Sequence, residues 1–380
     1  MKICMIYDFL TELGGLEREM LNHYKILKEE GYDIEILSCY IDLEAMKKVG
    51  FKDVKVSNIS TIKTKSELLS LILCFLGFNK LNDYNPDAFI SYSFPSNFLI
   101  RNKKCKKINY INHFPHFLYL SSKEKIEWAS GTKGFKRWAI TLISWPFQTF
   151  IKKLDKRLVK ENDLVFMNSK FTKKRLDKIY GCKDSIVSYV PVDGIFKPSN
   201  VKINEKYIFS SGRIIPDKKY EWLVLAVSKM KNKLPVYISG QGNEDYIKIL
   251  QGLAKKNKVE LKFLGRLSSE DLVSYYTNAS VFAFPTPGED FGLVPAESMS
   301  CGTPVVIWGD GAGPTEQVVD GVTGFHAKPY DLKEFALKLD KIIDGNMKTK
   351  NKKKIIAQGN KFSAEEVKNG FLKEVERVLG

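Results

Sequence analysis

The sequence predicts an α/β protein made of two doubly wound domains in series. Short apolar segments alternate with amphipathic ones in both halves of the 380-residue chain, the pattern of parallel sheets covered by helices on both faces. The alternation stops between Val192 and Glu205 and then restarts, which places a linker there. A chain of this length can form two hydrophobic cores. We therefore expect one domain at residues 1–197, a second at 203–355 and a C-terminal helix within 356–380.

In the first half, an apolar strand at Ile3–Tyr7 precedes Gly14-Gly15, which opens a helix that runs to about Glu30. Apolar residues recur along this segment at the helical period. The remaining apolar segments of this half are short and are expected to be strands. They lie at Asp33–Ser38, Asp87–Ser91, Lys107–Ile111, Asp163–Met167 and Ser185–Val190.

In the second half, further short apolar segments predict strands with helices between them. They lie at Tyr207–Ser211, Pro235–Ser239, Glu260–Leu264, Val281–Phe284 and Val305–Ile307. We interpret the basic run Lys348–Lys354 as a solvated connection. Ser363, which is followed closely by two glutamates, caps a last amphipathic helix that ends near Leu379.

Composition narrows the class of protein. An apolar fraction of 44% and a charged fraction of 27% are those of an ordinary globular protein. The six cysteines form no CxxC pair, so we expect buried free thiols in a reducing, cytoplasmic setting. With four histidines, a histidine metal cluster is not expected. Met1–Tyr7 already reads as a strand, so we expect no signal peptide, and the longest apolar run, Leu68–Phe78, is too short to cross a bilayer.

The positive charge is concentrated in one part of the chain. The net charge is +16, and residues 101–183 alone contain 21 Lys and Arg against 6 Asp and Glu. A focused basic region attracts phosphates, nucleic acid or an anionic membrane surface, and a solvated basic face is the alternative interpretation. Because the region lacks a nucleic-acid-binding motif, we expect no nucleic acid partner and keep a nucleic-acid-binding protein only as a distant alternative.

The most informative segment runs from Glu289 to Glu297, where two glutamates lie eight positions apart around Gly292. The predicted strand Val281–Phe284 precedes it, and a helical pattern follows. Glu289 is therefore expected on a loop at the carboxyl end of a strand, the edge at which open α/β sheets bind ligands. Glu297 is expected about two turns into the next helix. The unpaired N–H groups at the start of that helix favour an anion.

The segment Pro285–Val306 resembles the glutamate-x7-glutamate signature of retaining glycosyltransferases of family four, group 1. This resemblance implies the GT-B fold, two Rossmann-like domains that face each other across a cleft. It also implies that both glutamates bind a nucleotide-sugar donor, Glu289 through hexose hydroxyls and Glu297 through ribose hydroxyls. Backbone N–H groups then face the diphosphate, namely those of Phe291, Gly292 and Leu293.

A second segment that resembles the family is basic. Gly212-Arg213 follows the first strand of the second half, and Lys218 comes five residues after the arginine. Cations at a strand end suit the charge that develops on a leaving diphosphate. The family has the same spacing of glycine-arginine and lysine, which gives Arg213 and Lys218 this role. Its next residue is usually glycine, whereas this chain has Lys219. An exposed basic turn is the alternative interpretation.

Weaker signals complete the resemblance. Gly14-Gly15 matches a glycine pair that lets the backbone approach the donor, although any strand-to-helix turn can hold glycines. His113 matches the histidine beside the donor sugar in mannosyltransferase-like members, and a packed histidine is the alternative. Arg266 matches a position that lines the nucleotide base. The run Gly309–Gly313 either shapes the donor pocket or is a plain turn.

The aromatic segment Trp138–Ile151 has basic residues on both sides. Such a segment suits the membrane interface, where aromatic rings enter the lipid and lysines meet anionic headgroups. A core helix with basic ends is the alternative. The residues expected to contact lipid are Trp138, Trp145, Phe147, Lys152 and Lys153. This interpretation places the protein on the cytoplasmic face of a membrane.

Together with the resemblance, these segments predict a retaining, metal-independent hexosyltransferase that uses no cofactor. Glu289-Asp290-Phe291-Gly292 and His113-Phe114-Pro115 look closest to members that use GDP-mannose. The expected acceptor is a glycan or a lipid-linked oligosaccharide. A UDP-sugar donor is an alternative, and so is a nucleotide-sugar epimerase with the same fold.

Overall fold

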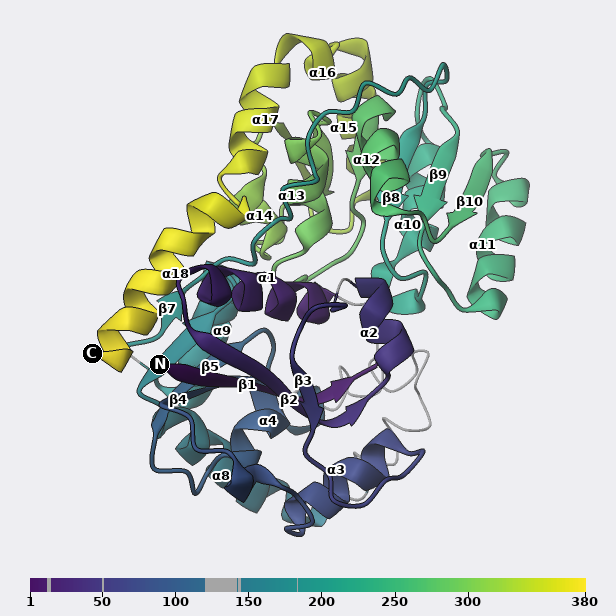
Figure 1. The fold of residues 1–380 in the computed structure, drawn as a ribbon. Helices are drawn as coiled ribbons and strands as arrows, with labels where there is room; N and C mark the ends of the chain where they lie inside the picture. Colours follow the sequence, from purple (N-terminus) through teal and green to yellow (C-terminus); the bar gives the residue numbers. More distant parts are fainter. Residues whose placement is uncertain (12–14, 50, 120–141, 143–144, 183) are drawn as a thin grey trace. The chain divides into compact units, whose positions relative to one another are not determined.

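The computed structural model describes residues 1–11, 15–49, 51–119, 142, 145–182 and 184–380 (Figure 1). These residues form two compact units. Unit 1 comprises the described residues up to Pro191 together with Val367–Gly380, and unit 2 comprises Val192–Glu366. Each unit is built on one parallel sheet, so the predicted α/β class is confirmed.

The sheet of unit 1 has seven strands in the order β3-β2-β1-β4-β5-β6-β7, and neighbouring strands run parallel. The strands are β1 (Lys2–Leu10), β2 (Asp33–Ile41), β3 (Val56–Asn58), β4 (Ala88–Tyr92), β5 (Lys106–Ile111), β6 (Leu164–Met167) and β7 (Ile186–Val187). Met5 of the central β1 pairs with Ile36 on one side and with Ile90 on the other. Because helices cover both faces, the side chains of Ile3–Ile6 in β1 are buried and apolar on both faces of the sheet.

Helices form a layer on each face of this sheet. They are α1 (Gly15–Glu29), α2 (Leu43–Val49), α3 (Glu67–Phe75), η1 (Leu81–Asp83), α4 (Ser93–Leu99), α5 (His116–Tyr119), η2 (Trp145–Phe147), α8 (Gln148–Lys160), α9 (Lys170–Tyr180) and α18 (Ala364–Leu379). α1 and α18 cover the face of Ile3 and Met5, where Phe371 of α18 is buried. α3 and α4 cover the face of Cys4 and Ile6, and α8 continues that layer (Figure 1).

The sheet of unit 2 has six strands in the order β10-β9-β8-β11-β12-β13, again with parallel neighbours. The strands are β8 (Ile208–Ser211), β9 (Val236–Ser239), β10 (Leu261–Gly265), β11 (Val281–Ala283), β12 (Val305–Trp308) and β13 (Gly324–Ala327). All of their carboxyl ends therefore lie at one edge. Loops that follow these strands supply the residues of the candidate site.

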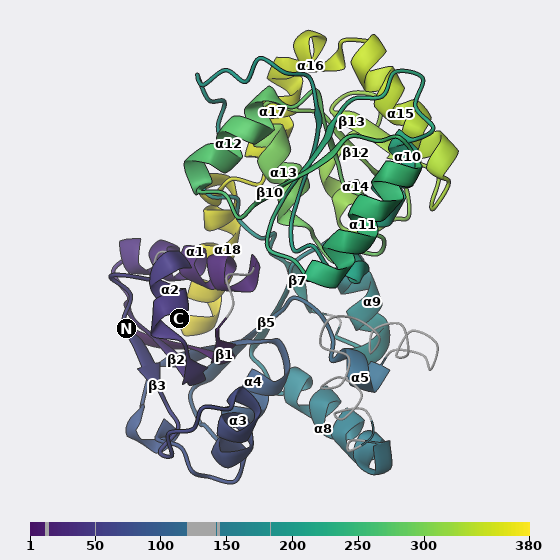
Figure 2. The same ribbon diagram turned by 90° about the vertical axis from the view of Figure 1, so that its right-hand side faces the viewer.

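The helices of unit 2 also form two layers. They are η3 (Pro216–Lys218), α10 (Tyr220–Val227), α11 (Glu244–Lys256), α12 (Ser269–Asn278), α13 (Leu293–Ser300), α14 (Pro314–Gln317), α15 (Leu332–Asp344), α16 (Met347–Lys350) and α17 (Lys352–Asn360). Figure 2 shows α10, α11 and α15 on one side of the strands and α12, α13 and α17 on the other. Leu223, Leu250 and Phe335 anchor the first layer and are fully buried.

The basic run Lys348–Lys354 is helical and not a plain connection, although Lys350 and Lys352–Lys354 are exposed as expected. It lies in α16 and α17, and the Nζ of Lys348 donates to the carbonyls of Thr277 and Ala279 at 2.7 and 2.5 Å. Burial lowers the pKa of Lys348 to about 8. The lysine thus caps the carboxyl end of α12, a use that composition alone does not reveal.

Candidate active site

The sheet of unit 2 has a topological switch point between β8 and β11. From β8 the chain moves outward through β9 to β10, and from β11 it moves the opposite way through β12 to β13. In open parallel sheets ligands bind beyond the carboxyl ends of the strands at such a point. The loop after β8 carries Arg213 and Lys218, and the loop after β11 carries Glu289. The switch point therefore brings together segments more than 70 residues apart in the sequence.

The loop after β8 needs glycine for steric reasons. Gly212 has φ +140°, and a Cβ on the neighbouring Gly240 would lie 1.9 Å from the Gly212 carbonyl oxygen. The two loops therefore pack backbone against backbone. The next residue, Arg213, is exposed, and Lys218 ends the short η3 turn. Lys218 is thus held near the carboxyl end of β8, and the side chain of Arg213, in the same loop, is exposed.

Lys218 and Glu289 form an ion pair. The Nζ of Lys218 lies 2.5 Å from Oε2 of Glu289, and the two side chains are 21% and 23% exposed. Partial burial makes the pair stronger than a surface salt bridge, and both side chains remain partly exposed. Lys218 and Glu289, which the resemblance assigned to the adjoining diphosphate and hexose of a donor, are therefore direct neighbours.

Gly292 connects this pair to the start of α13. Its φ is +74°, and an added Cβ would meet Cγ of Glu289 at 3.1 Å. No side chain caps α13 at this residue, so the N–H groups of its first turn, beginning with Leu293, have no helical partner. They give this end of the helix a partial positive charge that suits an anion. Phe291 is buried against Phe362, with ring centroids 5.8 Å apart.

The loop that carries Glu289 is clamped by α14 and the glycine run before it. Nε2 of the fully buried Gln317 donates to the carbonyls of Phe291 and Gly292 at 2.7 and 2.9 Å. The N–H of Gly313 donates to the Glu289 carbonyl at 2.9 Å. Sequence reasoning pointed to the glycine run but missed Gln317, since nothing in the sequence shows where its amide side chain reaches.

Glu297 lies deeper than expected. It is the fifth residue of α13, about one turn into the helix where the sequence suggested two. Only 2% of Glu297 is exposed, and its Oε2 accepts a hydrogen bond from the Tyr276 hydroxyl at 2.8 Å. That hydroxyl lies 2.6 Å from Oγ of Ser211. Burial, together with Glu297, raises the pKa of Tyr276 well above its usual range, so the tyrosine stays a neutral donor. No motif in the sequence pointed to Tyr276.

Arg266 lies farther along the same edge. It follows β10, the outer strand of the sheet, and β9 separates β10 from β8. Strand spacing puts it roughly 10 Å from the loop of Arg213, and its side chain is exposed.

The predicted residues of unit 1 also lie at strand ends. The strand order of this sheet reverses between β1 and β4, and Gly15 begins α1 directly after the β1 loop. Gly14 lies outside the described residues. His113 follows β5 and is exposed, whereas the preceding Asn112 is buried.

A buried glutamate that the sequence did not single out holds this strand end. Oε2 of Glu19, in α1, accepts a hydrogen bond from Nδ2 of Asn112 at 2.6 Å. The Asn112 carbonyl accepts from Nδ2 of Asn168 at 3.2 Å. Glu19 is 1% exposed, and burial raises its pKa to about 8. The residue before His113 is therefore fixed through both its side chain and its backbone.

The aromatic and basic segment is partly described. Trp145 and Phe147 in η2 are 74% and 61% exposed, so they are not part of a core. Lys153 of α8 is exposed, and Nζ of Lys152 lies 5.7 Å from the centre of the Tyr119 ring. Trp138 lies outside the described residues.

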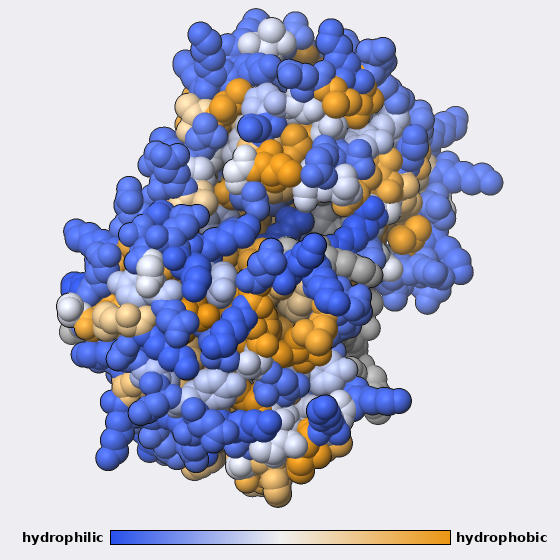
Figure 3. Space-filling view, in the orientation of Figure 1, coloured by the Kyte–Doolittle hydropathy of each residue, from blue (hydrophilic) through white to orange (hydrophobic). Residues whose placement is uncertain are grey.

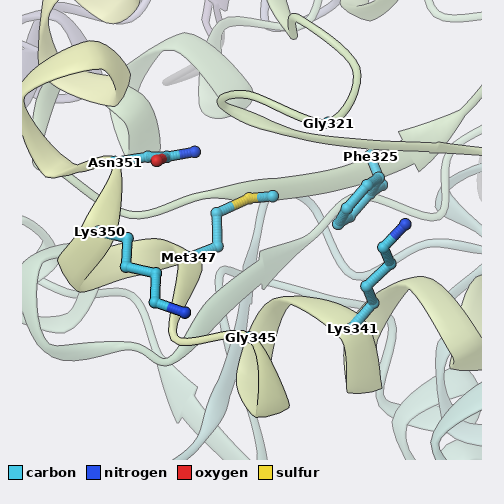
Figure 4. A pocket seen from close by; sticks show the side chains of 7 residues that line it. All are labelled: Gly321, Phe325, Lys341, Gly345, Met347, Lys350 and Asn351. Atoms are coloured by element: carbon cyan, nitrogen blue, oxygen red, sulfur yellow. The ribbon is translucent and has the colours of Figure 1, made fainter.

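A cavity of about 280 Å³ lies elsewhere in unit 2 (Figure 4). Its lining residues are Gly321, Phe325, Lys341, Gly345, Met347, Lys350 and Asn351. In Figure 4 the Met347 side chain extends between Asn351 and Phe325. None of the residues predicted for the donor site lines this cavity, so we assign it no part in the chemistry.

Comparisons with known proteins agree with the geometry of unit 2. Residues 192–362 match the family model described as glycosyl transferases group 1. An uncharacterized glycosyltransferase of Methanocaldococcus jannaschii is 27% identical over 352 residues, which cover 89% of this chain and 88% of that protein. A capsular polysaccharide biosynthesis glycosyltransferase of Staphylococcus aureus is 31% identical over 205 residues, which cover 48% of this chain and 53% of that protein.

Solved structures share the fold. HepE of Anabaena, solved with UDP and glucose, aligns with a TM-score of 0.77 at 17% identity over 99% of this chain and all of that one. Sucrose-phosphate synthase of Thermosynechococcus elongatus aligns with a TM-score of 0.78 at 16% identity over 99% of this chain and 98% of that one. The chain thus has the GT-B fold and is a glycosyltransferase. The match to the glycosyl transferases group 1 family covers residues 192–362, which lie in unit 2.

Proposed function

We propose that the chain is a retaining, metal-independent glycosyltransferase that moves a hexose, best assigned as mannose, from a nucleotide-diphosphate sugar to a glycan or lipid-linked acceptor. The observation that carries the proposal is the Lys218–Glu289 ion pair beside the uncapped start of α13. It combines a cation, a carboxylate and the first-turn N–H groups of a helix at the switch point of the sheet. A sugar diphosphate needs all three kinds of partner.

Each group has a role that its chemistry suits. The carboxylate of Glu289 accepts hydrogen bonds from hexose hydroxyls, and its contact with Lys218 fixes its orientation. The N–H groups at Gly292 and Leu293 bind the diphosphate. Glu297 accepts from ribose hydroxyls, which requires that it share its carboxylate between the ribose and Tyr276.

Departure of the nucleoside diphosphate leaves negative charge on its phosphates as the glycosidic bond breaks. Arg213, Lys218 and the α13 dipole stabilise that charge, the task that a divalent cation has in other transferases. The acceptor hydroxyl then attacks an oxocarbenium-like centre from the face that the nucleotide leaves, which retains the anomeric configuration. The same proposal gives roles to three further residues. His113 contacts the donor sugar, Gly15 contacts the donor phosphates, and Arg266 contacts the base.

Mannose is the best-supported sugar. The segments around Glu289 and His113 look closest to members that use GDP-mannose. An alpha-1,3/1,6-mannosyltransferase of Kluyveromyces lactis is 24% identical over an alignment that covers all of this chain and 85% of that protein. A UDP-sugar is the alternative donor, favoured by the UDP bound to HepE.

We also propose that the protein associates with the surface of a membrane. Within the part of the chain that the structure describes, no helix is both long and apolar enough to span a bilayer. Trp145 and Phe147 are exposed next to Lys152 and Lys153, the combination expected of an interfacial contact. A lipid-linked acceptor would be reached from that position.

A transfer assay tests the function. The full chain is incubated in EDTA with labelled GDP-mannose or UDP-glucose and with free or lipid-linked oligosaccharides, and NMR reads the anomeric configuration of the product. We expect an α-mannoside, and we expect Glu289→Ala and Arg213→Ala to abolish transfer. Glu260→Ala, at an exposed site of unit 2, is the matched control. An inverted product or near-normal turnover of the Glu289 variant contradicts the mechanism.

A further inference from the structure

Helix α3 of unit 1 is apolar on both of its faces. Its inner face buries Leu71 and Cys74 against the sheet, together with Ile59 and Leu99. Glu67, in the first turn, is the one charged residue of the helix. A helix on the outside of a unit normally turns charged residues to the solvent. Packing among the described residues of unit 1 does not explain the outer face of α3.

The outer face exposes a stripe of large side chains at helical spacing. The exposed fractions are 47% for Leu68, 47% for Leu69, 44% for Ile72, 70% for Leu76, 47% for Phe78 and 41% for Ile62. The Thr61 N–H donates to the Phe78 carbonyl at 3.1 Å, so the segments on either side of α3 are joined and Ile62 belongs to the same patch. Apolar surface is visible over this helix in Figure 3. Clustered exposed residues of this size mark a contact surface.

The patch continues toward the exposed aromatic residues of η2 and α8. The Phe75 ring of α3 lies 4.9 Å from the Phe98 ring of α4, and α4 packs in turn on α8. α3, α4 and α8 thus form one helical layer, and both ribbon views show α3 and α8 at the same side of the unit 1 sheet (Figures 1 and 2). Trp145, Phe147 and Phe150, which are 74%, 61% and 67% exposed, extend from this layer.

Exposed basic residues precede and follow α3 in the chain and lie along α8. Lys63, Lys65 and Lys80 flank α3 and are exposed. The exposed basic residues of α8 are Lys153, Lys156, Arg157 and Lys160. Its single acidic residue, Asp155, is buried and accepts hydrogen bonds from Tyr119 and Tyr180. Lysine is depleted at protein–protein interfaces, whereas leucine and tryptophan bordered by lysine are the composition of a segment that lies on anionic lipid.

We propose that the outer face of α3 inserts into the headgroup region of an anionic lipid bilayer and forms, with η2 and α8, the membrane-binding surface of unit 1. This inference rests on the membrane association proposed above and deepens it, because it adds a second contact in Leu68–Phe78, an apolar run too short to cross a bilayer. Insertion places the leucines in the acyl boundary and the flanking lysines at the phosphates.

Vesicle cosedimentation of the full chain tests the proposal. The vesicles contain phosphatidylcholine alone or with phosphatidylglycerol, at low and high salt. The test variant is Leu69→Ser/Ile72→Ser/Leu76→Ser. The matched control changes three exposed apolar residues of unit 2, Val201→Ser/Ile249→Ser/Leu337→Ser, which are 59%, 63% and 65% exposed. We expect the wild type to bind only the anionic vesicles and less so at high salt.

The expected effect follows from the area that each leucine buries. Removal of one inserted leucine costs roughly tenfold in partitioning, so the triple variant should bind at least about tenfold more weakly, and the control variant should bind like the wild type. The single variant Leu76→Ser, at the helix end, should bind the vesicles about tenfold more weakly. It keeps the test valid if the triple variant fails to fold. Nucleotide-induced thermal stabilisation should be unchanged in every variant, which separates this proposal from the donor site.

Three results would overturn the inference. The first is that the α3 variants bind anionic vesicles as tightly as the wild type. The second is that binding is lost only in Trp145→Ser/Phe147→Ser, which would leave the aromatic residues as the whole contact. The third is that the α3 variants bind lipid normally but change the sedimentation mass of the protein, which would identify the patch as a contact between two copies of the chain.

Discussion

Replacement of Gly313 by alanine is predicted to displace the donor loop while unit 2 remains folded. The added Cβ would lie 2.2 Å from the Asp290 carbonyl oxygen and 2.6 Å from the Cα of Phe291. Both contacts are to backbone, so no side-chain rotation relieves them. Ordinary contact requires a separation more than roughly 1 Å larger, and the loop must move by about that distance.

Two magnitudes follow from this displacement. Overpacking of this kind costs about 1–3 kcal/mol, which lowers the melting temperature of a unit of this size by about 2–12 °C. A shift of about 1 Å in the groups that position a substrate lowers turnover by about a hundredfold. The thermal effect is thus modest, whereas the loss of transfer is large, because Glu289 and Gly292 move with the loop.

The assay pairs differential scanning fluorimetry with transfer of labelled mannose. Gly252→Ala, in the middle of α11, is the matched control, because its Cβ meets nothing within 4 Å. Alanine there should raise stability slightly, by about 1 kcal/mol, and leave turnover unchanged. Normal turnover in Gly313→Ala would refute the view that this glycine holds the Glu289 loop in its active position.

Three further predictions follow from the site. Lys218→Met should abolish transfer and Lys219→Met should not, because only Lys218 is paired with Glu289; the reverse result in kinetics would reassign the phosphate ligand. Tyr276→Phe should weaken nucleotide binding in calorimetry by roughly tenfold, because the carboxylate of Glu297 loses a hydrogen bond worth about 1.5–3 kcal/mol; unchanged affinity would exclude this role. Burial raises the pKa of Glu19 to about 8, so folded Glu19 keeps its proton where the unfolded chain has lost it, and stability falls as pH rises from about 4.5 to 8. Glu19→Gln should remove up to roughly 4 kcal/mol of that fall in urea titrations at several pH values, and an unchanged slope would contradict it.

The main features of the site were predictable because they depend on strand ends. Parallel strands put their carboxyl ends at one edge, so Lys218 and Glu289 were expected close together although 71 residues separate them. The glycines at 212 and 292 were predictable for the same reason. The periodicity of apolar residues thus predicted where the strands end, and the loops that follow the strands contain the residues of the candidate site.

Other features depend on tertiary packing that no local pattern records. Gln317 and Tyr276 act through side chains that reach across the unit to a loop and to a buried carboxylate. The edge strands β3 and β13 were missed, because short segments of three and four residues carry little periodic signal. Glu19 looks like a surface residue of an amphipathic helix until the strand end that it binds is seen.

The most direct test of the central claim is a thermal titration of the full chain with GDP, UDP, GDP-mannose and UDP-glucose in EDTA. A ligand at a hundred times its Kd stabilises the folded state by about 2.7 kcal/mol, which corresponds to a shift of about 5–11 °C for a unit of this size. We predict this shift with GDP and GDP-mannose, and its loss in Arg213→Ala and Glu289→Ala. A shift with the UDP compounds alone would replace the donor, and no shift with any nucleotide would contradict the assignment of the Lys218–Glu289 pair as a donor site.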